Sequence, residues 1–400
     1  MSRNGSWLWA AGIMDKAEDP RWAVGKGGRG RRACVGPLAV LVAVVSVSVG
    51  AARVGATEYS VTEIPMPDWA YALALNSSGQ VLAGGHSKGY FWDGTTTWIL
   101  RPPGSDDCNG CTVHFFGMND AGAVVGTVRG EQDRAFLWQG GVMTDLGALW
   151  VGRSYANGIN NAGQVVGYAS AAPGVPPNPF LWDDGVTRDL GTLGGIGGAA
   201  WGINDSGQIV GAAGTEDQES HAFLWSDGVM TDLGTLGGKS VAVAINNEGT
   251  VVGNSQTPDG VFHAFCWSDG VMTDLGTLGG TESWATDIND CGQVIGVWRD
   301  GHNYGGFLYT SEDGMRNLAD LLPEALSSVP VDLGGINKYG QLVVNAPVSE
   351  GDYRGTRPFI LTPVPEPDTI ALILASASMT LFWRRDGMTR FGKRAPSVET

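Results

Sequence analysis

Basic residues are scarce in this chain. Its 400 residues include 25 Lys and Arg against 41 Asp and Glu, which gives a formal net charge of −16 at pH 7. So acidic a chain is repelled by phosphate backbones and by anionic lipid. The composition therefore excludes nucleic acid as an expected partner, and it leaves contact with a membrane only to the C-terminal segment described below.

Cysteines are few as well. Cys108 and Cys111 form a single CxxC pair, which without a second pair is a weak zinc signal, and we expect a local disulfide there. Cys291 is a candidate free thiol in a turn. No stretch has the alternating Asp/Asn spacing of a calcium loop, so no cofactor is expected, and calcium has no motif to support it.

Sequence signatures of catalysis are missing. The chain has no nucleophile elbow, no HExxH, no P-loop and no recognisable pair of acids. The sequence therefore predicts a protein that is not an enzyme. Acids that meet only in space leave no such trace, so an enzyme stays open as an alternative.

One phrase occurs seven times: Asn-x-x-Gly, followed by two or three aliphatic residues and usually a second Gly. Successive copies are 41 to 48 residues apart. They begin at Asn76, Asn119, Asn160, Asn204, Asn246, Asn289 and Asn337. A period of this length is typical of modular β-structures such as propellers.

Each repeat unit predicts four short β-strands. In the third unit these are 154–160, 163–168, 179–182 and 187–193, each bounded by Gly, Asn or Asp. Asn-x-x-Gly suits a type I turn between the first and second strands. Asp-Gly suits a tight hairpin between the third and fourth, at 184–185, 227–228, 269–270 and 313–314. Helical periodicity is absent. Aromatic residues of the third strands are expected to fill the space between units, both the repeated Phe and the aromatic residue that follows it: Trp92, Trp138, Trp182, Trp225, Trp267 and Tyr309.

The two ends of the repeat region predict a closed ring. The last unit supplies a first, a second and a third strand but no fourth, and 59–64 at the beginning aligns with a fourth strand. Pairing this N-terminal strand with the last unit closes the ring and removes two exposed sheet edges. We therefore predict an all-β, seven-bladed β-propeller with four strands per blade, closed by the N-terminal strand.

Alternating strand direction gives the propeller two different ends. The turn end carries the first-to-second and third-to-fourth turns, which are uniform and short. The loop end carries the second-to-third loops and the blade-to-blade connections, which vary: 7 residues separate Gly84 from Phe91, but 13 separate Gly167 from Phe180. Variable loops on a rigid scaffold are where binding usually occurs. Four histidines fall on or beside these loops and are candidate ligand residues, with ordinary loop-end residues as the alternative: His86, His221, His263 and His302.

Both termini carry targeting features. Residues 1–56 comprise an N-terminal extension and a signal peptide, with two arginines before an uncharged run and a small-residue cleavage site. Residues 57–363 form the propeller. Residues 364–400 contain Pro365-Glu366-Pro367, an apolar segment of fifteen residues, and the basic pair Arg384 and Arg385. As a helix, that segment spans roughly 22 Å, which predicts a short transmembrane segment.

The C-terminal features resemble the PEP-CTERM sorting signal of Gram-negative bacteria. The resemblance implies recognition and cleavage by an exosortase, after a transient stay in the inner membrane, and delivery to the cell surface or the biofilm matrix. The tail departs from the pattern in its long extension after Arg385. The repeat region is similar to the HAF repeats of extracellular bacterial proteins, through His-Ala-Phe at 221–223 and 263–265 and Asp-Leu-Gly-Thr-Leu-Gly-Gly at 232–238 and 274–280.

These observations predict an exported, non-catalytic binding module. Its expected ligand is exopolysaccharide or another surface protein, held at the loop end. One alternative is a carbohydrate-active propeller enzyme with acids near the central channel. The other is a structural matrix component without a specific ligand.

Overall fold

The computed structural model describes residues 59–67, 70–85, 88–100, 112–130, 132–147, 152–327, 331–350 and 353–364. Several predictions concern other parts of the chain and therefore lie outside the described residues. These are the signal peptide, His86, the Cys108–Cys111 disulfide, and the sorting tail with Pro365, Glu366, Pro367, Arg384 and Arg385. Among the residues that are described, no helix is both long enough and apolar enough to cross a membrane.

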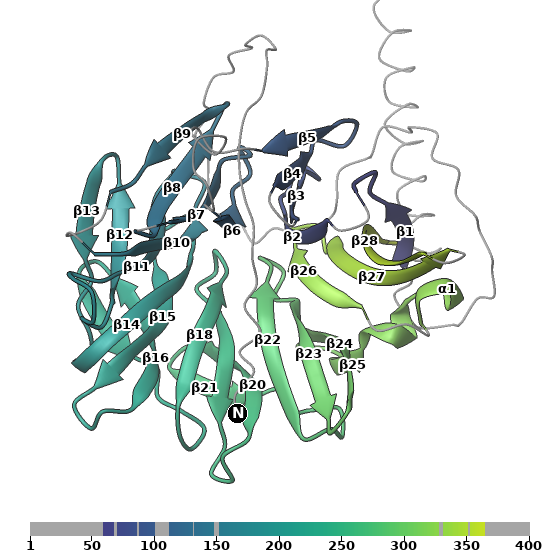
Figure 1. Cartoon of the computed structure of the whole chain (residues 1–400). Coiled ribbons are helices and arrows are strands. Elements are labelled where there is room, and N and C mark those ends of the chain that lie inside the picture. Colours follow the sequence, from purple (N-terminus) through teal and green to yellow (C-terminus); the bar gives the residue numbers. More distant parts are fainter. Residues whose placement is uncertain are drawn as a thin grey trace, which may run out of the picture.

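The strands form seven antiparallel sheets of four strands each, arranged as blades around a central axis (Figure 1). The predicted seven-bladed β-propeller is confirmed. The first strands of neighbouring blades contact one another all the way round, and β26 of blade 7 contacts β2 of blade 1. These first strands therefore surround the axis, and the fourth strands form the outer rim.

Blades 1 to 4 follow one another along the chain. Blade 1 contains β2 (Tyr71–Leu75), β3 (Val81–Gly84), β4 (Gly89–Trp92) and β5 (Thr97–Leu100). Blade 2 contains β6 (Thr112–Met118), β7 (Val124–Arg129), β8 (Arg134–Gln139) and β9 (Val142–Asp145). Blade 3 contains β10 (Ser154–Ile159), β11 (Val165–Ala169), β12 (Asn178–Asp183) and β13 (Val186–Asp189). Blade 4 contains β14 (Gly194–Ile203), β15 (Ile209–Thr215), β16 (Ser220–Ser226) and β17 (Val229–Asp232).

Blades 5 to 7 complete the ring. Blade 5 contains β18 (Ser240–Ile245), β19 (Val251–Gln256), β20 (Phe262–Ser268) and β21 (Val271–Asp274). Blade 6 contains β22 (Glu282–Ile288), β23 (Val294–Asp300), β24 (Asn303–Thr310) and β25 (Gly314–Asn317). Blade 7 contains β26 (Asp332–Ile336), β27 (Leu342–Glu350), β28 (Tyr353–Pro363) and, as its outer strand, β1 (Tyr59–Glu63).

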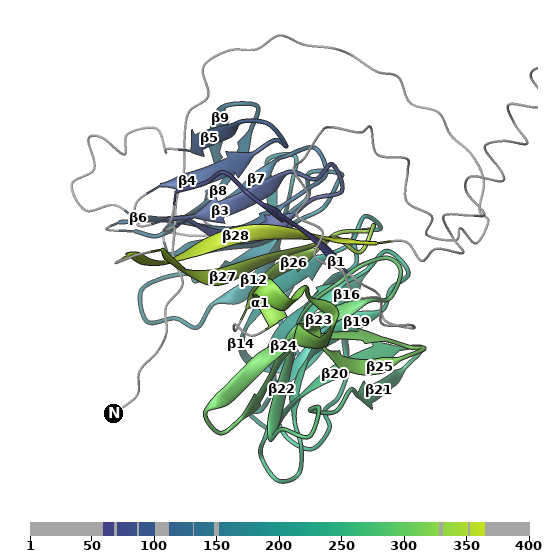
Figure 2. The same ribbon diagram turned by 90° about the vertical axis from the view of Figure 1, so that its right-hand side faces the viewer.

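The N-terminal strand closes the ring as predicted. β1 pairs with β28 in an antiparallel register that places Val61 opposite Leu361. The two strands lie side by side in both views, purple against yellow-green (Figures 1 and 2). A second fastening lies nearer the axis, where the buried side chain of Asn345 in blade 7 accepts a hydrogen bond from Ala72 N at 2.7 Å and donates one to Ala72 O at 3.0 Å. The N-terminal and C-terminal ends of the repeat region are thus joined, because blade 7 contains strands from both ends and is hydrogen-bonded to blade 1.

Turn chemistry follows the sequence with one exception. In the Asn-x-x-Gly turns the Gly has positive φ and donates to the carbonyl of the repeated Asn, as in Gly163 to Asn160 at 3.1 Å. The Asp-Gly turns at 184–185, 227–228 and 269–270 have positive φ at both residues, as a tight hairpin requires. At 313–314 only Gly314 has positive φ, because three residues separate β24 from β25 there.

The core between blades is centred on Phe rather than on Trp. Phe136, Phe223, Phe265 and Phe307 on the third strands are among the largest fully buried side chains. The Trp two residues later is buried in blades 2 and 4 and half-buried in blades 3 and 5. Each Phe ring covers the second Gly of the repeated phrase; a Cβ on Gly253 would lie 2.8 Å from the ring of Phe265 and 2.0 Å from Val241 O. The second Gly is therefore required by the packing of this ring.

Two short helical turns interrupt the all-β pattern. The 3₁₀ turn η1 (Leu318–Leu321) and the one-turn helix α1 (Glu324–Ser327) lie in the connection from blade 6 to blade 7. Leu318, Leu321 and Leu326 are buried there against blade 7. This insertion accounts for the longest repeat spacing, the 48 residues between Asn289 and Asn337.

Candidate functional site

At the turn end, the seven repeated asparagines form a closed ring of hydrogen bonds. The side-chain Nδ2 of each donates to the backbone carbonyl of the equivalent Asn in the next blade, at 3.0 to 3.1 Å. Asn337 of blade 7 donates to Asn76 O of blade 1 at 3.1 Å and closes the circle. All seven side chains are buried. Each Oδ1 also accepts from two backbone N–H groups of its own turn, as in Asn204 with Ser206 and Gln208.

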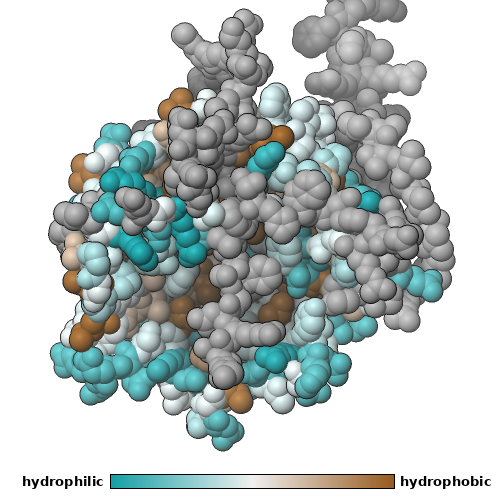
Figure 3. Space-filling model, viewed as in Figure 1, coloured by the Kyte–Doolittle hydropathy of each residue, from teal (hydrophilic) through white to brown (hydrophobic). Residues whose placement is uncertain are grey.

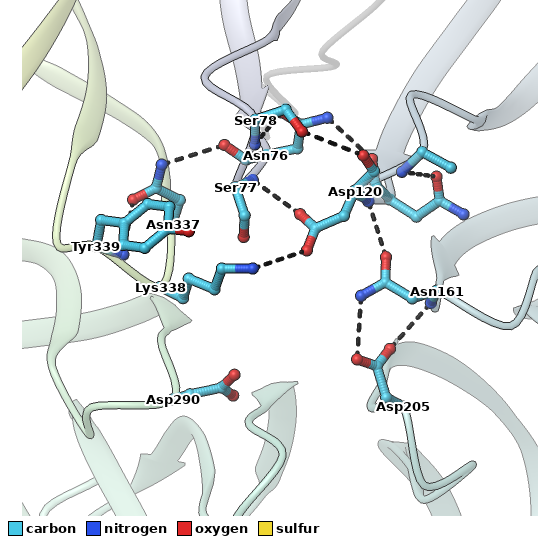
Figure 4. A network of polar contacts seen from close by, with 12 residues as sticks. Asn76, Ser77, Ser78, Asp120, Asn161, Asp205, Asp290, Asn337, Lys338 and Tyr339 are labelled. Atoms are coloured by element: carbon cyan, nitrogen blue, oxygen red, sulfur yellow. Dashed lines mark hydrogen bonds and ion pairs between the residues drawn. The ribbon is translucent and has the colours of Figure 1, made fainter. Parts of the chain in front are cut away.

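The residue after each asparagine forms a second, outer polar ring, which sequence reasoning missed. From blade 1 to blade 6, the backbone N–H of each member donates to the side-chain oxygen of the next, at 2.8 to 2.9 Å. The members are Ser77, Asp120, Asn161, Asp205, Asn247, Asp290 and Lys338. Lys338 has no acceptor to continue the chain, and its Nζ lies 3.5 Å from Asp120 Oδ2 instead (Figure 4). The alternation of Asn and Asp at this position was the signal available in the sequence.

The two rings surround a hollow of about 290 Å³ to which every blade contributes. The aliphatic residues that precede the asparagines in the sequence, such as Ile203 and Ile245, also line it. Most polar groups of the rings already bond to one another, because their oxygens accept backbone N–H groups and their amides donate to neighbouring oxygens. We call these two rings of residues the collar. Its polar groups are hydrogen-bonded mainly to one another, and these bonds link each blade to the next.

Further along each first strand, a β-bulge presents a different residue in every blade. The register shift lies just before the strand reaches the asparagine ring, and it occurs in all seven blades. Bulges re-aim side chains and recur beside functional sites. The seven bulge residues are all of different types: Leu73, Phe116, Asn157, Trp201, Val243, Thr286 and Gly334. Phe116 and Trp201 are the most open large ones, with 38% and 39% of their surface exposed.

Blades 2 to 4 carry an aromatic wall, which we define as His114, Phe116, Tyr155, Tyr168 and Trp201. The rings of Tyr155 and Tyr168 stack at 4.6 Å between centroids, and Tyr168 lies 6.0 Å from Trp201. His114 and Phe116 are 6.0 Å apart. Blades 5 and 6 have only Val243 and Thr286 at the positions of Phe116 and Trp201. At the bulge positions, blades 2 and 4 thus carry aromatic residues and blades 5 and 6 do not.

The titratable groups of this wall are held neutral. Burial and the hydrogen bond from its hydroxyl to Asp133 raise the pKa of Tyr155 to about 12. Burial and the nearby charge of Arg129 lower the pKa of His114 to about 4. Near neutral pH both side chains are therefore uncharged.

Asp287 is a carboxylate on the first strand of blade 6 that bonds to the neighbouring blade. It occupies the position held by Gly117, Gly158 and Gly202 in blades 2 to 4. Its Oδ1 accepts from Ile288 N at 2.8 Å and its Oδ2 from Ile336 N of blade 7 at 3.0 Å. Burial outweighs these hydrogen bonds and raises its pKa to about 6.

The structure places the predicted histidines apart from one another. His221 and His263 lie in blades 4 and 5, each with Nδ1 2.8 Å from the carboxylate of Asp232 or Asp274 on the next strand. The same polar pair between third and fourth strands recurs in blades 2, 3 and 7 as Arg134–Asp145, Asn178–Asp189 and Arg357–Glu63. The histidines of the HAF phrase therefore occupy a position that bridges two strands in five blades. His302 differs, because it lies on the exposed hairpin of blade 6 and lines a side pocket.

Two findings concern cysteine and metal chemistry. Cys291 is disulfide-bonded, so its interpretation as a free thiol was wrong; the other half of the bond lies outside the described residues. The free cysteine among those described is Cys266, half-buried on a third strand. In the same part of the chain, no group of three or more His, Cys, Asp or Glu is arranged to hold a metal ion.

The exposed hydrophobic residues of the described part of the chain include several valines. On the face seen in Figure 3, hydrophobic residues form separate patches among hydrophilic ones. Val142, Val186, Val229 and Val271, each 62% to 67% exposed, begin the outer strands of four successive blades. Hydrophobic residues scattered singly over a surface are ordinary.

Comparisons with known proteins found no family and only distant structural likenesses. No protein-family profile and no curated protein matches the sequence. Among solved structures, the chain is similar to TolB from Acinetobacter baumannii, with 15% identity, 76% of this chain and 80% of that one covered, and a TM-score of 0.43. It is also similar to a gluconolactonase from Xanthomonas campestris, with 12% identity, 78% of this chain and 100% of that one covered, and a TM-score of 0.37. A third similar structure is the Aleuria aurantia lectin, with 10% identity, 65% of this chain and 95% of that one covered, and a TM-score of 0.37. These proteins include both enzymes and non-enzymes, so the likeness assigns no activity.

Proposed function

We propose that this protein is an exported β-propeller that binds exopolysaccharide or a surface protein through its aromatic wall and loop end, without catalysing a reaction. One observation carries the proposal: the bulge positions of the first strands differ in all seven blades, whereas the asparagine ring beside them is the same in all seven. Repetition is what fastening the blades needs. Recognition of a ligand instead needs side chains that differ from blade to blade, and a β-bulge changes the direction in which such a side chain points.

The chemistry of the aromatic wall favours a carbohydrate or a protein surface over a charged small molecule. Aromatic side chains supply large contact areas, and Tyr adds a polar group at one end. The wall is neutral near pH 7, as the pKa values of Tyr155 and His114 require. Phe116 and Trp201 have enough exposed surface to contact a ligand.

Co-sedimentation of the full-length protein with the exopolysaccharide of its own host, with and without calcium, tests this function. We expect saturable binding. We also expect no shortening of the polymer, which size-exclusion chromatography of the supernatant measures. Absence of binding to polymer and to cell-surface proteins in cross-linking on intact cells would favour a structural matrix component instead.

One observation favours the alternative of a carbohydrate-active enzyme. Asp287 has a pKa near 6, which is the range that a general acid uses. A polymer that is shortened by the protein, but not by the Asp287→Asn variant, would establish that alternative. An unchanged polymer length argues against it.

We propose that delivery follows the sorting tail. An acidic chain with a signal peptide at one end and Pro365-Glu366-Pro367 before an apolar segment and Arg384-Arg385 at the other suits export and exosortase cleavage. Replacing the three residues of this motif by Ala in the native host should retain the uncleaved chain in the inner membrane. Immunoblots of cell fractions measure this, and unchanged size and location would contradict the proposed route.

A further inference from the structure

A side pocket at the loop end of blade 6 sets this blade apart from the others. It lies between the hairpin of β23 and β24 and the connection that contains η1 and α1, and its volume is about 330 Å³. Ligand pockets commonly begin at this size.

The pocket occurs where blade 6 lacks the polar side chain on its third strand that forms a repeated polar pair in other blades. In blades 2, 3, 4, 5 and 7, a polar side chain on the third strand bonds to a carboxylate on the fourth. In blade 6 the corresponding residues are Gly305 and Asn317, and both line the pocket. Asn317 Oδ1 accepts from Ala319 N at 3.1 Å, as the Asp of other blades accepts from a Gly N at 2.8 Å. Its Nδ2 has no partner among the described residues.

Gly305 keeps the space open. The ring of Trp298 on the neighbouring strand lies against it, so that a Cβ at this position would be 2.9 Å from Trp298 Nε1. On the other side of the strand, a Cβ on Gly306 would be 3.2 Å from Leu318 Cδ2. The missing side chain of the pair therefore cannot be supplied without moving an indole ring.

The lining of the pocket is uncharged, although the chain as a whole is strongly acidic. It contains no Asp, Glu, Lys or Arg. His302, Asn303 and Tyr304 are exposed, and their side chains make no hydrogen bond to any described residue. Leu322 and Val331 supply apolar surface opposite. An aromatic face with free amide and hydroxyl groups matches a polyhydroxylated ligand that has both apolar and hydrogen-bonding surfaces.

The surroundings discriminate against a negatively charged ligand. Asp300 is the cross-strand partner of Asn303; Arg299 is that of Tyr304, but its Nε donates to Gly301 O, and neither Lys nor Arg is among the described residues that line the pocket. A carboxylate brought here would lose hydration without gaining a counter-ion.

We propose that this pocket binds one neutral sugar unit of a polysaccharide. The inference rests on the proposed function and names the ligand class and the place where that ligand is held. In this proposal the ring of Tyr304 stacks against the sugar ring, and the side-chain amides of Asn303 and Asn317 donate to sugar hydroxyls.

Titration of the full-length protein with methyl glycosides tests the proposal. The probes are methyl glucoside, galactoside and mannoside, with methyl glucuronide as the acidic counterpart, and the readout is saturation-transfer NMR with tryptophan fluorescence. We expect at least one neutral glycoside to bind with a Kd on the order of millimolar, and glucuronide to bind about tenfold more weakly. The double variant Tyr304→Ala, Asn303→Ala should weaken binding at least about tenfold.

The matched control is the double variant His221→Ala, His263→Ala, which removes polar pairs at the same end of blades 4 and 5. It should bind the glycoside as the natural chain does. Unfolding curves of both double variants verify that each is folded. Absence of saturation up to about 100 mM, equal affinity for glucuronide, or unchanged affinity in the Tyr304 and Asn303 variant would each overturn the proposal.

The failure of this pocket is distinguishable from failure of the proposed function. If the Tyr304 and Asn303 variant still co-sediments with host polysaccharide as well as the natural chain, the pocket is not the site and the binding function stands. If neither protein binds the polysaccharide nor any glycoside, both proposals fall.

Discussion

The two ends of this propeller use the same repeat in opposite ways. At the turn end, the seven asparagines make the same bonds in every blade, and their polar groups are fully used. At the bulges beside this ring, equivalent positions carry Phe116 in one blade and Thr286 in another, and at the loop end Gly305 stands where His221 stands elsewhere. Within one chain, repetition therefore marks the positions that hold the blades together, and divergence marks those free to recognise a ligand.

The largest expected effect concerns the asparagine ring. Asn204→Ala removes two donors and two accepted bonds at a buried site and leaves the N–H groups of Ser206 and Gln208 unsatisfied. We expect the free energy of unfolding to fall by about 3–5 kcal/mol. Urea unfolding followed by tryptophan fluorescence measures the loss.

The control for that variant is its neighbour in the outer ring of the next blade. Asn247→Ala also removes several hydrogen bonds, but from an exposed side chain. The expected loss is below about 1.5 kcal/mol, since water replaces the missing partners. Equal losses for the two variants would contradict the structural role given to the inner ring.

A pH-dependent effect of intermediate size is expected from Asp287. Its folded-state pKa of about 6 lies above the ordinary value of 3.8, so the folded state binds the proton more tightly. This contribution to the free energy of unfolding is fully present below about pH 4 and is lost as the pH rises through 6. The residue keeps part of its surface exposed, so we expect a change of about 1–2 kcal/mol between these limits.

Asp287→Gly, which restores the residue of blades 2 to 4, isolates this effect. The free energy of unfolding of the natural chain, minus that of the variant, should fall between pH 4 and 6. His114 changes stability in the opposite sense, because its lowered pKa makes it lose stability as the pH falls from 6.5 towards 4. That contribution is common to both proteins and cancels in their difference. Parallel pH profiles would show that Asp287 does not titrate in this range.

A smaller effect is expected from the repeated polar pair. His221→Ala removes one partly exposed interaction with Asp232, which should cost about 0.5–1 kcal/mol of unfolding free energy. Binding of polysaccharide should not change, since the same position bridges strands in four other blades. A loss of binding without loss of stability would return His221 to the ligand-contacting residues.

The smallest effect is expected at the break in the outer ring. Lys338→Met removes a half-exposed ion pair with Asp120 and should lower the free energy of unfolding by less than about 1 kcal/mol. The difference from the natural chain should shrink further in high salt, because exposed charges are screened. Unfolding curves at low and high salt measure both quantities, and a loss above about 2 kcal/mol would show that the collar depends on this bridge.

Most of the fold was predictable because it is written in local and periodic features. The seven asparagines gave the number of blades, and the alignment of 59–64 with a fourth strand gave the closure that β1 and β28 make. The helical turns after β25 were missed because a one-turn helix has too few residues to show a period. The aromatic core between blades was predicted, but the deeper burial of Phe than of Trp was not, because the contact of the Phe ring with the second Gly depends on the neighbouring strand.

The site was less predictable because it is defined by differences between blades in three dimensions. Variable loop length drew attention to the loop end, where His302 lines a pocket, but it could not show that His221 and His263 are paired with Asp232 and Asp274. The bulge residues are invisible without a strand register. Asn317 and Gly305 become informative only when placed opposite one another across a hairpin.

The central claim is that binding belongs to the divergent positions and not to the repeated collar. Quantitative co-sedimentation with host exopolysaccharide of two sets of variants tests it most directly. One set is Phe116→Ser with Trp201→Ser, and the other is Asp120→Asn with Asp205→Asn and Asp290→Asn, which resembles the natural Asn161 and Asn247. We predict that the first set weakens binding at least about tenfold and that the second leaves it within about twofold. Full binding by the first set together with loss of binding by the second would contradict the account.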